Sequence, residues 1–149
     1  MSGGSKDAEV WCIEIDLRAH NRVAILAHPM YPRLRIFDGS SLNEKVAQEV
    51  SQKTLRCECV MVILDSNHTH EHVLGELNLY ASLVSVGSYC VVFDTVIEDL
   101  EGVEFVDRPW GKGNNPKTAV AEFLKTNSDF VVEAAIDDKL LISAASGGF

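Results

Sequence analysis

Short apolar runs alternate with amphipathic segments along most of this chain. The run at 59–64 (CVMVIL) is continuously apolar, which is typical of a strand buried on both faces. The stretch at 69–84 repeats apolar residues with a period of about 3.6, which predicts a helix. A second apolar run follows at 89–93 (YCVVF). This order predicts two parallel strands joined by a crossover helix in an α/β sheet.

The same alternation extends toward both ends of the chain. Strands are expected at 10–16 and 34–37, and helices at 18–28, from a Ser41–Glu44 capping box to about Lys53, and after an Asn115 cap with Pro116 in the first helical position. The segments at 130–135 and 140–145 are close enough to pair as a hairpin. The pattern therefore predicts a mostly parallel sheet with an antiparallel C-terminal hairpin strand. It also predicts a disordered Gly/Ser-rich tail at 1–9, followed by one domain at 10–149.

Composition narrows the class of protein. Of the 149 residues 46% are hydrophobic and 23% are charged, and the net charge is −9. This balance is that of an ordinary globular protein and argues against nucleic acid or an anionic membrane as the main partner. No apolar run approaches the roughly 20 residues that span a bilayer, and no secretory signal is visible, so we expect a cytoplasmic protein. Four cysteines without a C-x-x-C pair predict reduced, buried thiols.

Two carboxylates directly follow the central strands and form the best-defined candidate site in the sequence. Asp65 comes directly after the run at 59–64, and Asp94 directly after the run at 89–93. The carboxyl ends of parallel strands meet at one edge of a sheet, where ligands bind in open α/β folds. Carboxylate oxygens are the ligands that Mg²⁺ prefers. The alternative is that one aspartate caps a helix and the other is a solvated turn residue.

Three histidines lie close behind Asp65. His68 is positioned to act as the general base for a substrate hydroxyl, because its ordinary pKa lies near neutrality. We expect His70 and His72 to lie on the helix surface. The segment His68-x-x-Glu71-His72 also matches the H-x-x-E-H pattern of some zinc peptidases, which is a remote alternative because the preceding strand places it at a helix start.

Other polar residues at strand ends and in a long loop suggest ligand contacts. Glu14 lies near the end of the first predicted strand, where an acidic residue can accept hydrogen bonds from ribose hydroxyls, or can simply be solvated. The D-G-S-S segment that ends in Ser41 could contact an adenine edge or form only a turn and helix cap. The polar connection at 97–114 is long enough for a functional lid, and Trp110 within it could stack on a sugar or simply anchor the loop.

Several of these segments resemble one family. The run ILDSNHTHEHVLGELNLYASLVSVGSYCVVFDT, with IEIDLRAHNR, FDGSS, PWGKGNNPKTAVAEFL and KLLISAASGGF, is similar to the cephalosporin hydroxylase and rhamnosyl O-methyltransferase family. The resemblance implies a Rossmann-like three-layer sandwich, the class I S-adenosylmethionine-dependent methyltransferase fold. Its sheet order is 3-2-1-4-5-7-6, with strand 7 antiparallel and strands 6 and 7 formed by the C-terminal hairpin.

The resemblance also implies roles for the candidate residues. Glu14 would bind the cofactor ribose, Ser41 would lie near adenine, and Asp65 and Asp94 would ligate Mg²⁺. His68 would deprotonate the hydroxyl of a sugar or another small molecule, and Asp65 would also contribute to catalysis and cofactor binding. The sequence leaves open whether the chain forms a homo-oligomer.

Two departures from the family pattern qualify this expectation. Phe93 stands where many relatives carry an acidic residue, so a metal ion would keep two protein carboxylates and bind more weakly. In addition, the match begins at the family's strand 2, and no strand is followed by a G-x-G-x-x-G loop. We therefore expect a truncated or divergent methyltransferase, with a catalytically impaired remnant of the fold as the alternative.

Overall fold

The computed structural model describes residues 8–149, which divide into two compact units. Unit 1 reaches to Glu49 and unit 2 runs from Val50 to the end of the chain, and each is described by itself. The predicted tail at 1–9 falls largely outside the described residues. Within it, Glu9 accepts a hydrogen bond of 2.8 Å from the Arg35 guanidinium.

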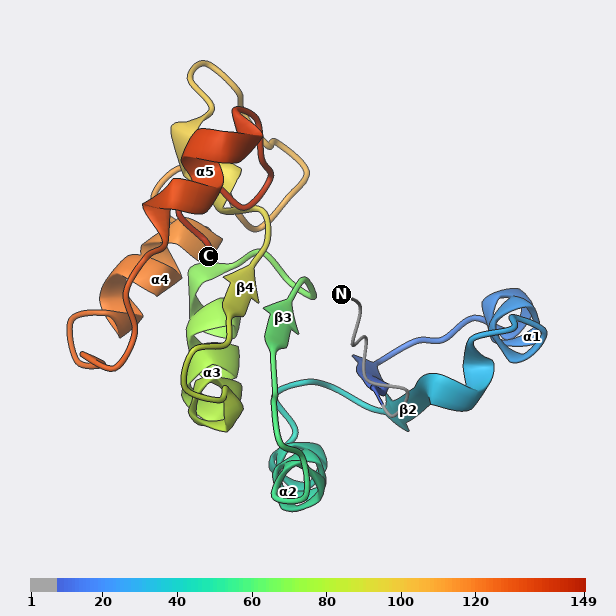
Figure 1. The fold of residues 1–149 in the computed structure, drawn as a ribbon. Coiled ribbons are helices and arrows are strands. Elements are labelled where there is room, and N and C mark those ends of the chain that lie inside the picture. Colours follow the sequence, from blue (N-terminus) through green and yellow to red (C-terminus); the bar gives the residue numbers. More distant parts are fainter. Residues whose placement is uncertain (1–7) are drawn as a thin grey trace. The chain divides into compact units, whose positions relative to one another are not determined.

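Unit 1 contains a parallel pair of strands joined by a helical crossover (Figure 1). Strand β1 (Val10–Glu14) pairs with β2 (Leu34–Asp38) over its whole length, as the apolar runs predict. Between them lie α1 (Ala19–Leu26) and a short 3₁₀ helix, η1 (Tyr31–Arg33). Helix α1 ends before Pro29, because proline disfavours helical conformation in the residue that precedes it.

Helix α2 (Glu44–Thr54) begins two residues later than the capping box with Ser41 as N-cap predicts. Its first turn is capped by Asn43, whose Oδ1 accepts hydrogen bonds from the backbone N–H of Lys45 at 2.9 Å and of Val46 at 3.4 Å. Ser41 lies two residues before this cap. Asparagine is at least as good an N-cap as serine, and it stands next to the first helical residue.

Unit 2 repeats the parallel arrangement with shorter strands. Strand β3 (Val62–Leu64) pairs with β4 (Cys90–Val92), and the crossover consists of α3 (His70–Tyr80) followed by a 3₁₀ turn, η2 (Ala81–Leu83). The expectation that this strand is buried on both faces is wrong. Ile63 is 54% exposed, because α3 covers only the face that carries Leu64.

Each unit has its own pair of parallel strands. Over residues 8–149 the structure contains two separate two-stranded parallel sheets, β1–β2 and β3–β4. The fold is therefore mixed α/β with parallel pairing, as predicted, and one mostly parallel sheet that contains all four strands stays a prediction.

The core of unit 2 lies between β3, β4 and two helices. Helix α4 (Pro116–Phe123) packs beside α3, as Figure 1 shows, and both supply apolar side chains to the strands. The buried core consists of Leu64, Val73, Leu77, Ala81, Val92, Ala119 and Phe123. Burying each large aliphatic or aromatic side chain contributes about 1.5–3 kcal/mol, so this cluster is the main source of stability in unit 2.

The predicted C-terminal hairpin is wrong. Residues 134–140 form helix α5 (Ala134–Leu140), and Glu133 caps it by accepting a hydrogen bond of 3.3 Å from the N–H of Ala135. The last residues then run beside β4, where the Val92 N–H donates to the Gly148 carbonyl at 2.8 Å. The A-A-I-D-D-K-L segment has good helix formers and an acidic cap, which outweigh its short apolar runs.

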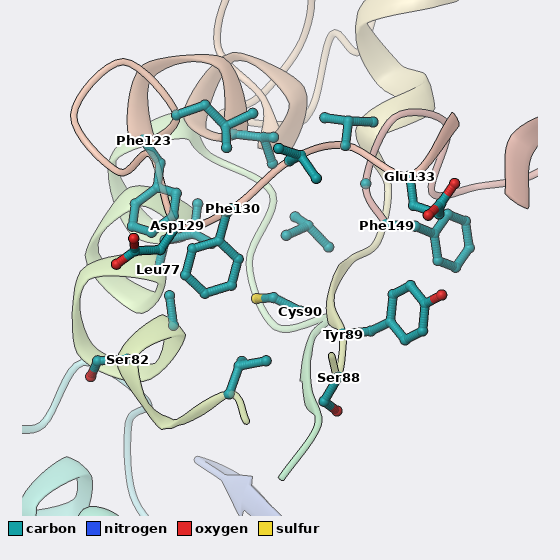
Figure 2. Close-up of a pocket in the computed structure, with 18 of the residues that line it drawn as sticks. Leu77, Ser82, Ser88, Tyr89, Cys90, Phe123, Asp129, Phe130, Glu133 and Phe149 are labelled. Carbon is teal, nitrogen blue, oxygen red and sulfur yellow. The ribbon is translucent and has the colours of Figure 1, made fainter. Parts of the chain in front are cut away.

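A cavity of about 860 Å³ opens in unit 2 between α3, α4 and the C-terminal residues (Figure 2). Phe123, Phe130 and Phe149 line it together with Cys90. Burial raises the pKa of the Cys90 thiol to about 11, so the thiol is protonated at neutral pH. All four cysteines are free, but Cys57 and Cys59 are exposed, because they lie outside the strand. The expectation of buried thiols is thus wrong for this pair.

Candidate functional site

The ends of β3 and β4 bring Asp65, His68 and Asp94 together. One ligand atom from each side chain lies within 4.8 Å of the others. Asp65 follows β3, Asp94 follows β4 by two residues, and His68 lies in the connection from β3 to α3. Parallel pairing places both strand ends at the same edge of the sheet, which explains why residues far apart in sequence meet here.

Asp94 has an unusual backbone conformation. Its φ of 56° and ψ of 21° place it in the left-handed region, which few residues other than glycine and asparagine or aspartate adopt. It stands at the start of a 3₁₀ helix, η3 (Thr95–Asp99), yet its side chain makes no capping hydrogen bond. Such outliers are concentrated at functional sites. Asp65 does not cap α3 either, because Thr69 occupies that position.

His68 is oriented by two neighbours. Its Nδ1 lies 3.3 Å from Oδ2 of Asp94, and its ring meets the Trp110 indole edge to face at a centroid distance of 4.7 Å. In the tautomer that carries its proton on Nδ1, the Nδ1–H group points to the Asp94 carboxylate. Nε2 then keeps a lone pair that can accept a proton. The half-buried imidazole is therefore held in an orientation that suits either a base or a metal ligand.

Trp110 belongs to the long connection that the sequence suggests as a lid. The Arg108 guanidinium lies over the indole ring, 5.3 Å from its centroid, so Trp110 contacts both Arg108 and His68. Lys112 and Asn114 lie in the same connection, and a contact of either residue with a sugar stays a prediction. Lys112 is exposed, and the Asn114 side chain bonds within the chain, accepting from the His70 N–H at 3.0 Å and donating to the Pro109 carbonyl at 2.8 Å.

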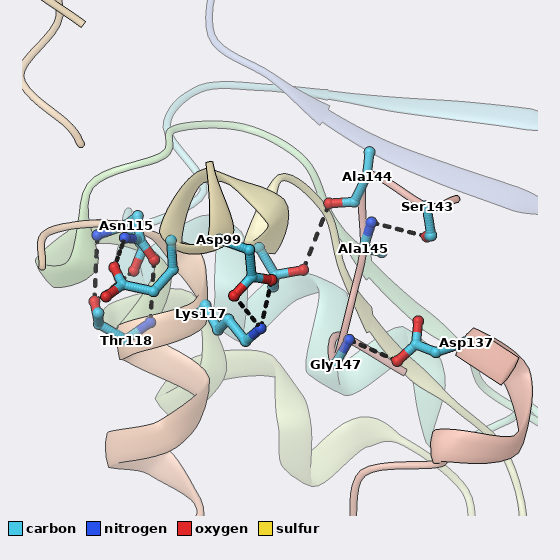
Figure 3. A network of polar contacts seen from close by, with 11 residues as sticks. Asp99, Asn115, Lys117, Thr118, Asp137, Ser143, Ala144, Ala145 and Gly147 are labelled. Carbon is cyan, nitrogen blue, oxygen red and sulfur yellow. Dashed lines mark hydrogen bonds and ion pairs between the residues drawn. The ribbon is translucent and has the colours of Figure 1, made fainter. Parts of the chain in front are cut away.

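Glu98 accepts hydrogen bonds from the C-terminal end of the connection that contains Trp110, a role that the sequence did not indicate. Its carboxylate accepts hydrogen bonds from the Gly113 N–H at 2.8 Å and from the side-chain amide of the fully buried Asn115. The Gly113 bond and then the Asn115 bond hold the pKa of Glu98 below its ordinary value. Asn115 also caps α4 as predicted, exchanging hydrogen bonds with Thr118 in a capping box (Figure 3).

His70 and His72 are not simply surface residues. His70 Nδ1 lies 2.8 Å from the Thr118 hydroxyl, and its Nε2 lies 3.3 Å from the Glu122 carboxylate, so it links α3 to α4. His72 Nε2 lies 3.6 Å from the carboxylate of Glu76. Within the described chain the cluster that contains His68 includes the two aspartates and not His72, which does not favour the zinc-peptidase alternative.

The predicted cofactor residues Glu14 and Ser41 lie in unit 1. Glu14 ends β1, is half-buried, and accepts a hydrogen bond of 3.0 Å from the Asp16 N–H. A carboxylate can accept about four hydrogen bonds, so Glu14 retains capacity for ribose hydroxyls. Ser41 is half-buried in the connection from β2 to α2. The roles of both residues stay predictions.

Parallel strands that end in a carboxylate–histidine cluster define a mixed α/β protein with a candidate cation site. The family model described as rhamnosyl O-methyltransferase/CmcI matches residues 2–149. The chain belongs to this family, which confirms the resemblance found in the sequence.

Curated relatives point in the same direction. Rhamnosyl O-methyltransferases from Mycobacterium bovis and Mycobacterium tuberculosis are 28% identical to this chain over 120 residues, which cover 79% of the chain and 46% of each relative. The chain therefore spans about half the length of these relatives. No solved structure matches it significantly. No helix in the described part of the chain is long and apolar enough to cross a membrane.

Proposed function

We propose that this chain takes part in transferring a methyl group from S-adenosylmethionine to a hydroxyl of a sugar such as rhamnose. The observation that carries the proposal is the meeting of Asp65, His68 and Asp94 at the ends of two parallel strands in a member of this family. The printed names of the relatives, rhamnosyl O-methyltransferases, support a sugar acceptor. For the complete fold we propose the three-layer sandwich that the resemblance implies.

The donor set fits a divalent cation. Asp65 is exposed and Asp94 is half-buried, so both carboxylates are accessible to a hydrated ion. Mg²⁺ keeps several waters and is commonly held by one or two protein carboxylates. When bound, it would supply Lewis-acid polarisation of the acceptor oxygen. Phe93 offers no oxygen ligand beyond its backbone carbonyl, so we expect affinity below that of a three-carboxylate site.

His68 is proposed as the general base. Its Nδ1 lies 3.3 Å from Oδ2 of Asp94, which orients the ring so that Nε2 is available to the substrate hydroxyl. The hydroxyl proton would pass to Nε2 of His68, the acceptor oxygen would gain the methyl group, and the sulfonium sulfur of the donor would become a thioether. Glu14 would accept hydrogen bonds from the cofactor ribose, with Ser41 near adenine and Asp65 as a further contact.

Titration calorimetry with MgCl₂ and MnCl₂ tests the metal site. Asp65→Asn and Asp94→Asn are each expected to weaken Mn²⁺ binding by about tenfold or more, because each removes an anionic oxygen ligand. Phe93→Glu is expected to strengthen binding by restoring a third carboxylate. Asp38→Asn, which changes a carboxylate at the end of β2 that is ion-paired with Arg22, is the matched control and leaves binding unchanged. Equal affinity in all four variants contradicts the assignment.

Titration with S-adenosylhomocysteine tests the cofactor. We expect saturable binding at or below millimolar concentration, with a weaker response in Glu14→Ala because a ribose acceptor is lost. If no heat is released at millimolar ligand by folded protein, with or without Mg²⁺, the methyltransferase proposal is overturned. The chain would then be a remnant of the fold without cofactor turnover.

A further inference from the structure

Glu76 is a charged residue in the interior of unit 2. It lies in the middle of α3, and only 2% of its surface is exposed. One carboxylate oxygen, Oε1, accepts a hydrogen bond of 2.7 Å from the Ser66 hydroxyl, and Oε2 has no hydrogen-bond partner within residues 8–149. Burying a carboxylate is costly, and an apolar residue of similar size often serves packing equally well. A buried glutamate with a single close hydrogen bond therefore points to a role for that bond.

The hydrogen bond reaches the segment that carries the candidate cation site. Ser66 follows Asp65 directly and lies two residues before His68, in the connection from β3 to α3. Ser66 is exposed, so packing does little to hold it in place. The same segment is fixed farther along by Asn67, whose Oδ1 accepts hydrogen bonds from the N–H and the hydroxyl of Thr69, both at 2.9 Å. Glu76 thus accepts a hydrogen bond from the residue that directly follows Asp65.

His72 places a second donor beside the same carboxylate. It lies one turn before Glu76 on α3, with Nε2 3.6 Å from Oε1, and its side chain is 22% exposed. This distance allows an ion pair with protonated His72 but is too long for a direct hydrogen bond. Ser66 therefore donates the direct hydrogen bond to Glu76, and His72 lies beside the same carboxylate oxygen.

We propose that Glu76 is a positioning residue for the cation site. By holding Ser66 it sets the backbone after β3, so that Asp65 and His68 face Asp94. This inference rests on the metal site proposed above. Groups that orient metal ligands without touching the ion typically change metal affinity by about 10–100-fold when they are removed. The effect of Glu76 acts through Asp65 and needs no contact with the ion.

Mn²⁺ binding, followed by electron paramagnetic resonance of the free ion, tests the proposal on the full chain. Ser66→Ala and Glu76→Ala are each expected to raise the Mn²⁺ dissociation constant about 10-fold or more. Glu76→Gln keeps an amide oxygen that can accept the Ser66 hydrogen bond, so it should stay within about threefold of the wild type. This rescue by the conservative variant distinguishes positioning from general destabilisation. Ser66→Ala changes an exposed residue and keeps the test decisive if Glu76→Ala fails to fold.

Phe130→Ala is the control for destabilisation. Phe130 packs on Phe123 at a ring-centroid distance of 5.7 Å and belongs to the segment after α4. It should lower the unfolding temperature without changing Mn²⁺ affinity. Unchanged affinity in Ser66→Ala, with wild-type protein that binds Mn²⁺, overturns the role of Glu76 and leaves the metal site standing. If the folded wild type does not bind Mn²⁺ at millimolar concentration, the proposed metal site and this inference both fall.

Discussion

In unit 1, strands β1 and β2 pair in parallel over five positions, yet no residue of either strand or of α1 is buried. In unit 2, strands β3 and β4 pair over only three positions, but they carry the buried Leu64 and Val92 and are covered by α3 and α4. Both pairs come from the same strand–helix–strand sequence pattern. The comparison shows that the local pattern is enough to predict a parallel pair, whereas burial depends on what packs against it.

The candidate cation site belongs to the better-buried pair. Asp65 and Asp94 extend from strands whose inner face is packed, and Asp94 keeps a left-handed backbone that costs about 1–3 kcal/mol and needs surrounding structure to hold it. A site of this kind needs a rigid support, because small displacements of ligand atoms weaken metal binding. The core of unit 2 supplies that support.

The largest expected difference between the units comes from removing one leucine in each. Leu77 in α3 is 3% exposed and Leu26 in α1 is 51% exposed. Leu77→Ala should lower the free energy of unfolding by about 2–5 kcal/mol, because it leaves a cavity. Leu26→Ala should change it by no more than about 0.5 kcal/mol. Urea unfolding followed by circular dichroism measures both values, and similar losses would contradict the contrast drawn between the units.

A glycine beside β4 gives a smaller expected effect. A Cβ atom on Gly148 would clash with the Val92 carbonyl oxygen, whereas one on Gly111 would come no nearer than 4.0 Å to Phe105. Gly148→Ala should therefore cost about 1–3 kcal/mol through forced displacement of the C-terminal residues from β4. Gly111→Ala should stay within about 0.5 kcal/mol. Equal unfolding temperatures for the two variants would show that this strand edge contributes little.

The smallest expected effect depends on pH and involves Glu98. Because its hydrogen bonds depress the folded-state pKa, Glu98 adds stability that is complete above the ordinary glutamate pKa of about 4.3. That stability disappears as the pH falls through the lower folded-state pKa. Unfolding temperatures of wild type and Glu98→Gln should therefore differ at pH 7 and converge toward pH 3. A difference that does not change with pH would mean that the charge of Glu98 contributes nothing.

An exposed ion pair in unit 1 provides the comparison for Glu98. Arg22 and Asp38 are 2.7 Å apart, with 44% and 67% of their side chains exposed. Such surface pairs contribute about 0–1 kcal/mol and are screened by salt. Asp38→Asn should thus have little effect on stability in 1 M NaCl, where the hydrogen bonds of Glu98 to Asn115 and Gly113 persist.

Much of the local structure could be predicted from the sequence. The first two strands were predicted at 10–16 and 34–37 and are found at Val10–Glu14 and Leu34–Asp38. These strands, the amphipathic helix after Asp65 and the Asn115 cap all follow from patterns that act within a few residues. Helix α2 begins later than predicted because Asn43, rather than Ser41, accepts the hydrogen bond from the N–H of Lys45. The prediction of a C-terminal hairpin is wrong because helix propensity and the Glu133 cap outweigh two short apolar runs.

The amino-acid sequence alone determined the order of strands and helices, the family, and the position of Asp65 and Asp94 at the ends of strands, because these depend on residue type and local spacing. Only the tertiary structure decided that His68 contacts Asp94, that Trp110 packs on His68, and that Glu76 is buried against Ser66. Those contacts join residues from different elements, and their geometry is set by how helices pack on a strand pair. That packing depends on the whole core and cannot be read from any single segment.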